Sequence, residues 1–452
     1  MATSAVPVPD GVTATADARR RVPRTDLTLA DPRLVDLART VGAATVRAAV
    51  HRAQELVRAG QIAPDELVDA ILAESPARST NLRPVLNATG VLLHTNLGRA
   101  ALSGAAREAL LVAAGCTDVE FDLSSGARAR RGRGTLDALR AAVPAAGGAH
   151  VVNNNAAALV LAATVLAAGR EIVLSRGELV EIGDGFRLPE LLTSTGARLR
   201  EVGTTNRTAA ADYAAAISPD TGFVLKVHPS NFRISGFTAG VEVAELARLG
   251  APVVVDIGSG LLTPERLLPD EPDADSALRA GAALVTASTD KLLGGPQGGL
   301  LLGDAALVER LRRHPLARAL RVDKLTLAAL EATLRGPVAP TAAALHASPD
   351  ALRDRAQRLA GRLRQAGVEA AAVDSRAVVG GGGAPGVELP SSAVSLRADI
   401  ARPLRECDPA VVGRLDADRL LLDLRTVADD QDDELFAAVV AVATMSAGPG
   451  SD

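Results

Sequence analysis

Short apolar runs recur along the middle of the chain, and stretches of helical periodicity separate them. Runs of this length that are rich in valine and leucine are typical of buried strands in parallel sheets. Strands that alternate with helices predict an α/β fold, in which a mostly parallel sheet carries helices on both faces. The strands are expected at Glu171–Leu174, Leu199–Val202, Phe223–Val227, Val253–Asp256, Ala283–Val285 and Leu300–Leu302.

The N-terminal part of the chain has a helical pattern only. The pattern predicts three helices: one capped by Asp31 or Thr28, a longer one over Val41–Ala59 and a short one after Pro64. Together they indicate a helical domain at residues 27–80. The polar stretch before it, residues 1–26, is expected to be disordered. In the longer helix, three arginines fall off the apolar face, where they are either solvated or available to a phosphate backbone; they are Arg47, Arg52 and Arg58.

The rest of the chain divides into a larger and a smaller α/β domain. The larger is expected at residues 81–336 and the smaller at 337–445, followed by a tail at 446–452. Four consecutive glycines, Gly380–Gly383, predict a hinge or loop within the smaller domain.

Composition excludes several classes of protein. The chain has 452 residues, of which 48% are hydrophobic, and a net charge of −4, so it is not a globally basic DNA-binding protein. The two cysteines lack CxxC spacing, so we expect no metal site. We find no signal peptide and no apolar span of membrane length, which predicts a cytoplasmic protein without a membrane partner.

A lysine and a carboxylate stand at the ends of two predicted strands. Lys291 lies in the glycine-rich stretch TDKLLGGPQGG, and Asp256 ends the strand PVVVD. Buried lysines are rare unless they are paired or reactive, and ligands of open α/β sheets bind at the carboxyl ends of strands. Pyridoxal phosphate (PLP) enzymes use such a pair: the lysine forms a Schiff base with the cofactor, and the carboxylate keeps the pyridine nitrogen protonated.

Other stretches offer groups for binding an anion. The junction at Asn153–Asn155 joins a strand to a long helix, and the N-terminus of a helix is a natural phosphate site. His228 ends a strand near the same predicted edge, where it has either a structural role or a contact with the cofactor. The stretch FDLSSGARARRGRG is either an anion-binding loop or a solvated basic one.

Nine stretches together form a specific combination: NATGVLLHTNLGRA (87–100), NNNAAAL (153–159), SRGELVEIGDGFRLPEL (175–191), EVGTTNRT (201–208), KVHPSNFRISGF (226–237), VDIGSG (255–260), DKLLGGPQGG (290–299), HPLARALRVDK (314–324) and DRLLLDLRTV (418–427). Through them the chain resembles the bacterial L-seryl-tRNA(Sec) selenium transferases, also called selenocysteine synthases. The resemblance covers most of residues 27–442 and implies a fold-type I PLP-dependent transferase.

The resemblance also implies roles for individual residues. Lys291 and Asp256 correspond to the catalytic pair that binds PLP, and the other expected cofactor contacts are Asn154, Asn155, Ala156, His228 and Ser288. The basic residues for the selenium-donor anion are expected to be Arg99, Arg131, Arg318 and Arg321. The arginine register between residues 121 and 134 departs from the family pattern, so Arg128 and Arg133 compete with Arg131.

The implied reaction converts seryl-tRNA(Sec) to selenocysteinyl-tRNA(Sec) with selenophosphate. The serine hydroxyl would be lost by β-elimination, and selenium would add to an aminoacrylyl intermediate. The N-terminal helices would hold the tRNA, and the family suggests a homo-oligomer, a decamer. One alternative is a PLP-dependent lyase for a small amino acid or amino sugar acid, against which the helical domain argues. Another is a tRNA-binding protein without catalysis, against which Lys291 argues.

Overall fold

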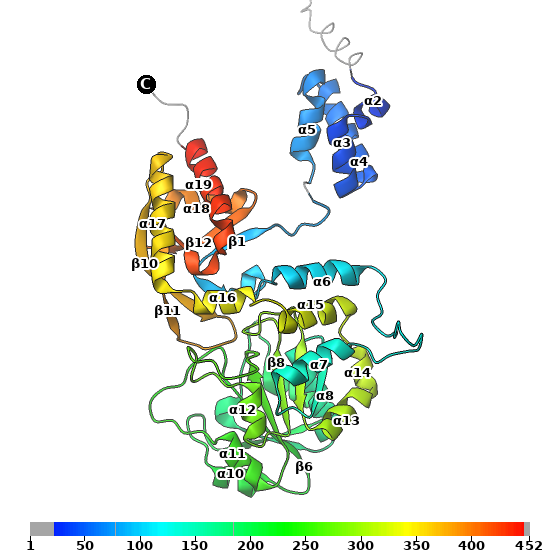
Figure 1. Cartoon of the computed structure of the whole chain (residues 1–452), viewed down its shortest axis with the longest axis vertical. Coiled ribbons are helices and arrows are strands. Elements are labelled where there is room, and N and C mark those ends of the chain that lie inside the picture. Colours follow the sequence, from blue (N-terminus) through cyan, green and yellow to red (C-terminus); the bar gives the residue numbers. More distant parts are fainter. Residues whose placement is uncertain (1–21, 77, 184, 447–452) are drawn as a thin grey trace, which may run out of the picture. The chain divides into compact units, whose positions relative to one another are not determined.

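The computed structural model describes residues 22–76, 78–183 and 185–446, and the chain divides into two units, Met1–Pro84 and Val85–Asp452. Most of residues 1–26, which were predicted to be disordered, and most of the predicted tail at 446–452 lie outside the described residues. Figure 1 shows the chain coloured along the sequence from the N-terminus to the C-terminus.

The first unit is a small helical bundle, as its pattern predicts. Its helices are α2 (Thr25–Leu29), α3 (Pro32–Val41), α4 (Ala43–Arg58) and α5 (Leu67–Glu74). The side chain of Asp31 caps α3 by accepting a hydrogen bond from the Arg33 N–H, which satisfies a donor that the first turn leaves unpaired. Aliphatic residues spaced three and four positions apart on α3, α4 and α5 form one core. It contains Leu34, Val46, Ala49, Val50, Ala53, Val57, Leu67 and Ile71.

The second unit is built on a seven-stranded sheet in the order β3-β9-β8-β7-β6-β4-β5. From β8 to β5 neighbouring strands are parallel, whereas β9 is antiparallel to both β3 and β8. The mostly parallel sheet is therefore confirmed, and each predicted strand is present. The strands are β3 (Gly148–Val152), β4 (Glu171–Ser175), β5 (Arg198–Val202), β6 (Thr221–Val227), β7 (Val253–Gly258), β8 (Leu284–Ser288) and β9 (Gly299–Gly303).

Helices cover both faces of this sheet. Alternate residues of one strand, such as Val253 and Val254, enter different hydrophobic clusters on the two faces, as expected from the twofold period of a strand. One cluster contains residues of α7 (Arg133–Ala142), α10 (Ala210–Ala216), α11 (Val243–Leu246), α12 (Ala274–Arg279) and α15 (Lys324–Arg335). The other contains residues of α8 (Asn155–Ala167), α9 (Leu188–Thr193), α13 (Ala305–Arg313) and α14 (Pro315–Ala319).

A six-stranded sheet forms the core of the smaller domain, in the order β1-β12-β13-β11-β10-β2. Its first and last strands come from the beginning of the unit, because β1 pairs with β12 and β2 pairs with β10. The predicted boundary at residue 81 thus differs from the division between the sheets. The strands are β1 (Val85–Ala88), β2 (Val91–Leu93), β10 (Ala371–Gly380), β11 (Glu388–Arg397), β12 (Ala410–Asp416) and β13 (Arg419–Asp423).

Three helices pack on the smaller sheet, and two more lie in the segments that join the two sheets. The three are α17 (Pro349–Gln365), α18 (Ala401–Glu406) and α19 (Asp432–Ser446), whose buried residues share a cluster with the strands. The other two are α6 (Gly104–Ala114), which packs against α15, and α16 (Pro340–His346).

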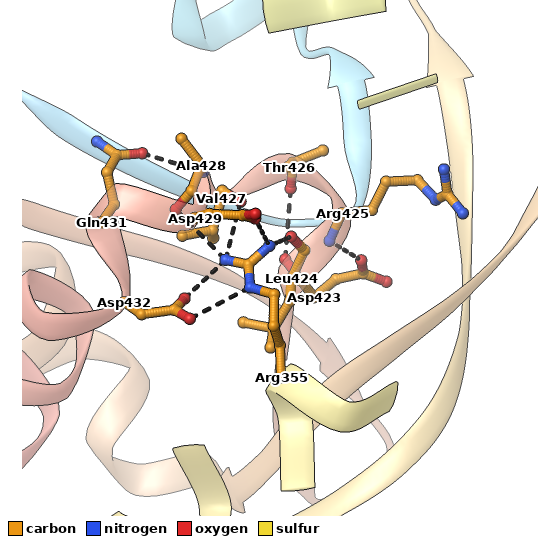
Figure 2. Close-up of polar contacts among 10 residues, drawn as sticks. All are labelled: Arg355, Asp423, Leu424, Arg425, Thr426, Val427, Ala428, Asp429, Gln431 and Asp432. Atoms are coloured by element: carbon orange, nitrogen blue, oxygen red, sulfur yellow. Dashed lines mark hydrogen bonds and ion pairs between the residues drawn. The ribbon is translucent and has the colours of Figure 1, made fainter. Parts of the chain in front are cut away.

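The turn after β13 is fixed by buried polar groups (Figure 2). Arg355 of α17 forms ion pairs of 2.6 Å with Asp432 and Asp429 and also donates to the Leu424 and Val427 carbonyls. The fully buried carboxylate of Asp423 accepts from two serines, Ser375 and Ser391. Buried charges are tolerated when they are paired in this way, so the turn has a defined conformation.

Candidate active site

Lys291 and Asp256 both lie at the carboxyl edge of the large sheet. Asp256 is in β7 and is 4% exposed, and Lys291 follows β8 and is 8% exposed. Because β7 and β8 are adjacent parallel strands, the sheet brings the carboxylate and the amine to the same edge.

Three donors hold the Asp256 carboxylate. Asn155 Nδ2 donates at 2.8 Å, the Gly258 N–H at 3.1 Å and Thr286 Oγ1 at 3.3 Å, all to Oδ1. Burial raises the pKa of Asp256, while the hydrogen bond from Asn155 and the charge of Lys291 oppose that rise. The site therefore stabilises a carboxylate that burial alone would tend to neutralise.

The Lys291 amine is enclosed without a partner. Burial lowers its pKa, the charge of Asp256 opposes this, and Arg99 adds to the lowering. Within the described residues, Nζ makes no hydrogen bond or ion pair. An amine in such surroundings loses its proton more readily than an exposed lysine and can act as a nucleophile or a base.

The junction of β3 and α8 presents a helix N-terminus to this edge. Asn154 caps α8 by accepting from the Ala157 N–H at 2.8 Å, and Ala156 lies in the first turn. A Cβ built on Gly299 of β9 would lie 2.0 Å from the Asn154 carbonyl oxygen, so only glycine permits this close approach. Ser288, the last residue of β8, is buried at the same edge. The N–H groups of the first turn can bind an anion.

Four buried polar atoms in segments at this end of the sheet have no hydrogen-bond partner within the described residues. They are His94 Nδ1, Asn155 Oδ1, Ser259 Oγ and Glu271 Oε1. Such atoms cost free energy unless a ligand or water pairs with them. A Cβ built on Gly258, whose φ is +66°, would lie 4.0 Å from Lys291 Nζ. Because glycine has no Cβ, this space beside the amine stays open. These residues therefore fit a group that carries an anionic substituent, ring polar atoms and a carbonyl that can react with an amine.

His228 joins the same edge through its backbone and through Glu271. Its N–H donates to the Asp256 carbonyl oxygen at 2.9 Å, and its Nε2 lies 3.2 Å from Glu271 Oε2. His228, Glu271 and Ala384 also line a cavity of about 910 Å³, to which neither Lys291 nor Asp256 contributes. His228 therefore lies between the strand edge and this cavity.

Two of the predicted anion-binding arginines, Arg131 and Arg321, form ion pairs with the same carboxylate, that of Glu120. Arg131 Nη1 lies 3.4 Å and Arg321 Nη1 3.6 Å from Glu120 Oε1, and Arg128 binds the other oxygen at 3.1 Å. Arg131 Nε is buried and has no partner. Arg133 instead pairs with Asp118 at 3.1 Å. Of the three arginines that compete in this stretch, Arg128 and Arg131 share Glu120, and Arg131 is the least exposed.

The other two predicted arginines are separate from this group. Arg99 pairs with Asp290, the neighbour of Lys291, at 2.8 Å. Arg318 is exposed, and its side chain forms no hydrogen bond or ion pair within the described part of the chain. Arg321 bridges to Val152 at the end of β3, which connects the segment of Arg318 and Arg321 to the strand before Asn154.

The predicted tRNA-binding arginines of α4 are exposed, as their positions off the apolar face indicate. Arg58 pairs with Glu55, whereas Arg47 and Arg52 form no ion pair within residues 22–76. Among the described residues, no group of histidine, cysteine and carboxylate side chains is arranged to hold a metal ion, and no helix is long and apolar enough to cross a membrane.

Four residues of this region were missed by the sequence analysis. Asp290 directly precedes Lys291 in the sequence, and this position could have indicated that its carboxylate lies near the amine. Glu120 and Glu271 lie in acidic stretches with no distinctive pattern, and only the fold brings them to Arg131 and His228. Gly382 belongs to the predicted glycine loop, but its contact with Lys291 depends on how the smaller domain packs.

Comparison with known proteins identifies the relatives of this chain. The L-seryl-tRNA selenium transferase family profile matches residues 85–428. The L-seryl-tRNA(Sec) selenium transferase of Moorella thermoacetica is 45% identical over 93% of this chain and 96% of its own length. That of Geobacter sulfurreducens is 42% identical over 94% and 99%.

A solved structure, that of a D-glucosaminate-6-phosphate ammonia-lyase, is similar with a TM-score of 0.55 and 18% identity. The likeness covers 81% of this chain and 97% of the lyase, and it concerns the fold alone. It confirms the predicted fold-type I architecture.

Proposed function

The chain belongs to the L-seryl-tRNA(Sec) selenium transferase family, and we propose that it converts seryl-tRNA(Sec) to selenocysteinyl-tRNA(Sec) with selenophosphate as the selenium donor. The observation that carries the chemistry is the buried pair of Lys291 and Asp256 at adjoining strand ends. Family membership supports the substrate, and the pair supports the type of reaction.

Pyridoxal phosphate is the cofactor that we assign to this site. When bound, it supplies an electron sink for the charge that develops at the α-carbon of the serine. Lys291 would hold it covalently, and Asp256 would keep a proton on its ring nitrogen. The first turn of α8, with Asn154 and Ala156, would bind its phosphate together with Ser288. His228 would contact it from the end of β6.

Lys291 is also the residue that we assign to proton transfer. Once the substrate amine replaces it, the lysine can take the α-proton, because burial favours its neutral form. The Cβ–O bond of the serine then breaks, and the oxygen takes the proton that Lys291 has accepted and leaves as water. The selenium of the donor forms a bond to Cβ while a proton is returned to the α-carbon. Water then cleaves the Se–P bond, so that phosphate leaves and the selenol remains.

The arginines supply the charge for the selenium donor. Arg131 and Arg321 converge on one point, and Arg99 lies beside Asp290 next to the lysine. Guanidinium groups bind phosphate-like anions in a bidentate manner. Arg318, which is exposed, completes this set in the proposal.

The N-terminal unit is the part that we assign to tRNA binding. Its exposed arginines Arg47, Arg52 and Arg58 can meet a phosphate backbone, and an enzyme with a small substrate would not need such a module. The family resemblance further supports a cytoplasmic homo-oligomer, with a decamer as the expected assembly.

The first experiment is an absorbance spectrum of the purified protein with PLP, followed by addition of charged seryl-tRNA(Sec). A visible band that shifts with seryl-tRNA(Sec) and not with free serine is expected. A band that responds only to small amino acids would favour a lyase, and no band after reconstitution would favour a tRNA-binding protein without catalysis. The K291A variant should lose the band and the covalently attached cofactor seen by mass spectrometry after borohydride reduction.

A further inference from the structure

The loop between β10 and β11 touches the lysine. This segment, residues 381–387, is called the glycine loop here. A Cβ built on Gly382, whose φ is +94°, would lie 2.6 Å from both Nζ and Cε of Lys291. A Cβ on Gly383 would lie 3.1 Å from a Leu292 side-chain carbon. The backbone of the glycine loop therefore forms one wall of the space around the amine.

Two hydrogen bonds hold the glycine loop in this position. At its start, the Gly381 N–H donates to the Leu93 carbonyl oxygen at 3.0 Å. Further along, the Ala384 N–H donates to Glu271 Oε2 at 2.7 Å. Ala384 has φ +45°, an unfavourable conformation for a residue with a side chain. Such a backbone persists only where its surroundings hold it, and here the bond to Glu271 does so.

Glu271 is an unusual residue for a structural bond. Its side chain is 1% exposed, it has no arginine or lysine within ion-pair distance in the described chain, and its Oε1 has no partner. Within the described residues, the side chain nearest to Oε2 that could pair with it is His228, whose Nε2 lies 3.2 Å away. Burying a carboxylate in this way costs free energy, so the position favours a role that an apolar residue could not fill.

We propose that Glu271 is a positioning residue that latches the glycine loop against Lys291 and so determines how closely the amine is enclosed. Glu271 fixes the glycine loop by accepting a hydrogen bond from the Ala384 N–H. The loop in turn confines Lys291 Nζ through the backbone of Gly382. Glu271 is also connected to the strand that carries Asp256, because His228 contacts both residues. The importance of the latch for catalysis rests on the proposed function of Lys291. The latch itself is a property of the chain without substrate.

The latch can be tested by the reactivity of the lysine. The chain has three lysines, Lys226, Lys291 and Lys324, so trace acylation of the full-length, cofactor-free protein followed by peptide mass spectrometry gives each rate separately. In E271A the acylation rate of Lys291 should rise at least tenfold, with Lys226 and Lys324 unchanged as internal standards. E271Q should stay within about twofold of the wild type, because an amide oxygen can still accept from the Ala384 N–H.

A second measurement follows the latch directly. The amide of Ala384 should exchange with solvent at least tenfold faster in E271A than in the wild type, because its acceptor is lost. The matched control is E66A, which removes a 2.9 Å bond from the Ala63 N–H to a carboxylate in the N-terminal unit. It should change neither the Lys291 rate nor the Ala384 exchange.

Specific outcomes would overturn the proposal. Wild-type acylation of Lys291 in E271A would show that Glu271 does not enclose the amine, and equal acceleration in E271Q and E271A would exclude the hydrogen bond as the cause. Faster labelling of all three lysines would mean general unfolding and would also count against a local latch. Because neither measurement uses tRNA or a selenium donor, failure here leaves the proposed function untouched, and the reverse also holds.

Discussion

Removing the Asn155 side chain should weaken cofactor binding through Asp256. Asn155 Nδ2 donates to the buried carboxylate at 2.8 Å, the shortest of its three hydrogen bonds. A hydrogen bond to a charged group contributes about 1.5–3 kcal/mol, and 1.4 kcal/mol is a factor of ten in a dissociation constant. We therefore expect N155A to bind PLP about 10- to 100-fold more weakly at neutral pH.

The pH dependence has a defined sign. The bond from Asn155 lowers the pKa of Asp256 against the raising effect of burial, so N155A raises that pKa further. The carboxylate then becomes protonated at a higher pH than in the wild type. The loss of affinity should consequently grow as the pH falls. Titration of the cofactor-free protein with PLP, followed by absorbance across a pH series, measures both effects.

Two comparisons isolate the role of Asp256 from that of the phosphate-binding turn. Pyridoxal, which lacks the phosphate, should lose affinity for N155A by the same factor as PLP if Asn155 acts through Asp256. T286V removes the 3.3 Å bond and should have a smaller effect. Wild-type affinity of N155A for PLP, or a loss confined to PLP and absent with pyridoxal, would refute the reasoning.

Three further predictions concern other parts of the chain. E120Q should bind thiophosphate, a stable analogue of the donor, about fivefold more tightly in calorimetry, since it releases Arg131 and Arg321 from ion pairs that together contribute about 1 kcal/mol; unchanged affinity would place the anion elsewhere. R355A should lower the free energy of unfolding by about 1–3 kcal/mol in urea, because it removes a buried guanidinium and leaves the Leu424 and Val427 carbonyls without their donor, and a loss below about 0.5 kcal/mol would contradict the importance of the network in Figure 2. Deleting residues 1–84 should weaken tRNA binding in a filter assay but leave PLP binding intact, and retained tRNA affinity would contradict the role of the N-terminal unit.

The sequence was sufficient for features that depend on local pattern. The capping position of Asp31 and the strands around Val253 and Leu300 follow from periodicity and side-chain type, and the structure has them. Helix α2, which begins at Thr25, extends into the range predicted to be disordered. Lys291 and Asp256 could be paired in advance because both follow apolar runs, and parallel strands bring their carboxyl ends to one edge.

Contacts between distant segments could not be predicted in this way. Glu120 reaches Arg321, and Glu271 reaches Ala384, only through the fold of loops whose own sequences carry no period. The same holds for β1 and β2: each is a short apolar run, and no local signal indicates that its partner lies in the C-terminal domain. The roles of the predicted arginines likewise depend on carboxylates that no motif reveals.

The pairing of β1 with β12 has a consequence for how the chain is made. Val85 forms its ladder with Ala410, roughly 300 residues later in the sequence. At a synthesis rate of about 5–20 residues per second, β1 leaves the ribosome about 15–60 s before its partner exists. During that interval the strands of the large sheet can pair with one another, whereas β1 and β2 have no partner strand with which to pair. The smaller domain thus begins before the large sheet and closes after it, and Gly382 reaches Lys291 only after every strand of the large sheet has been synthesised.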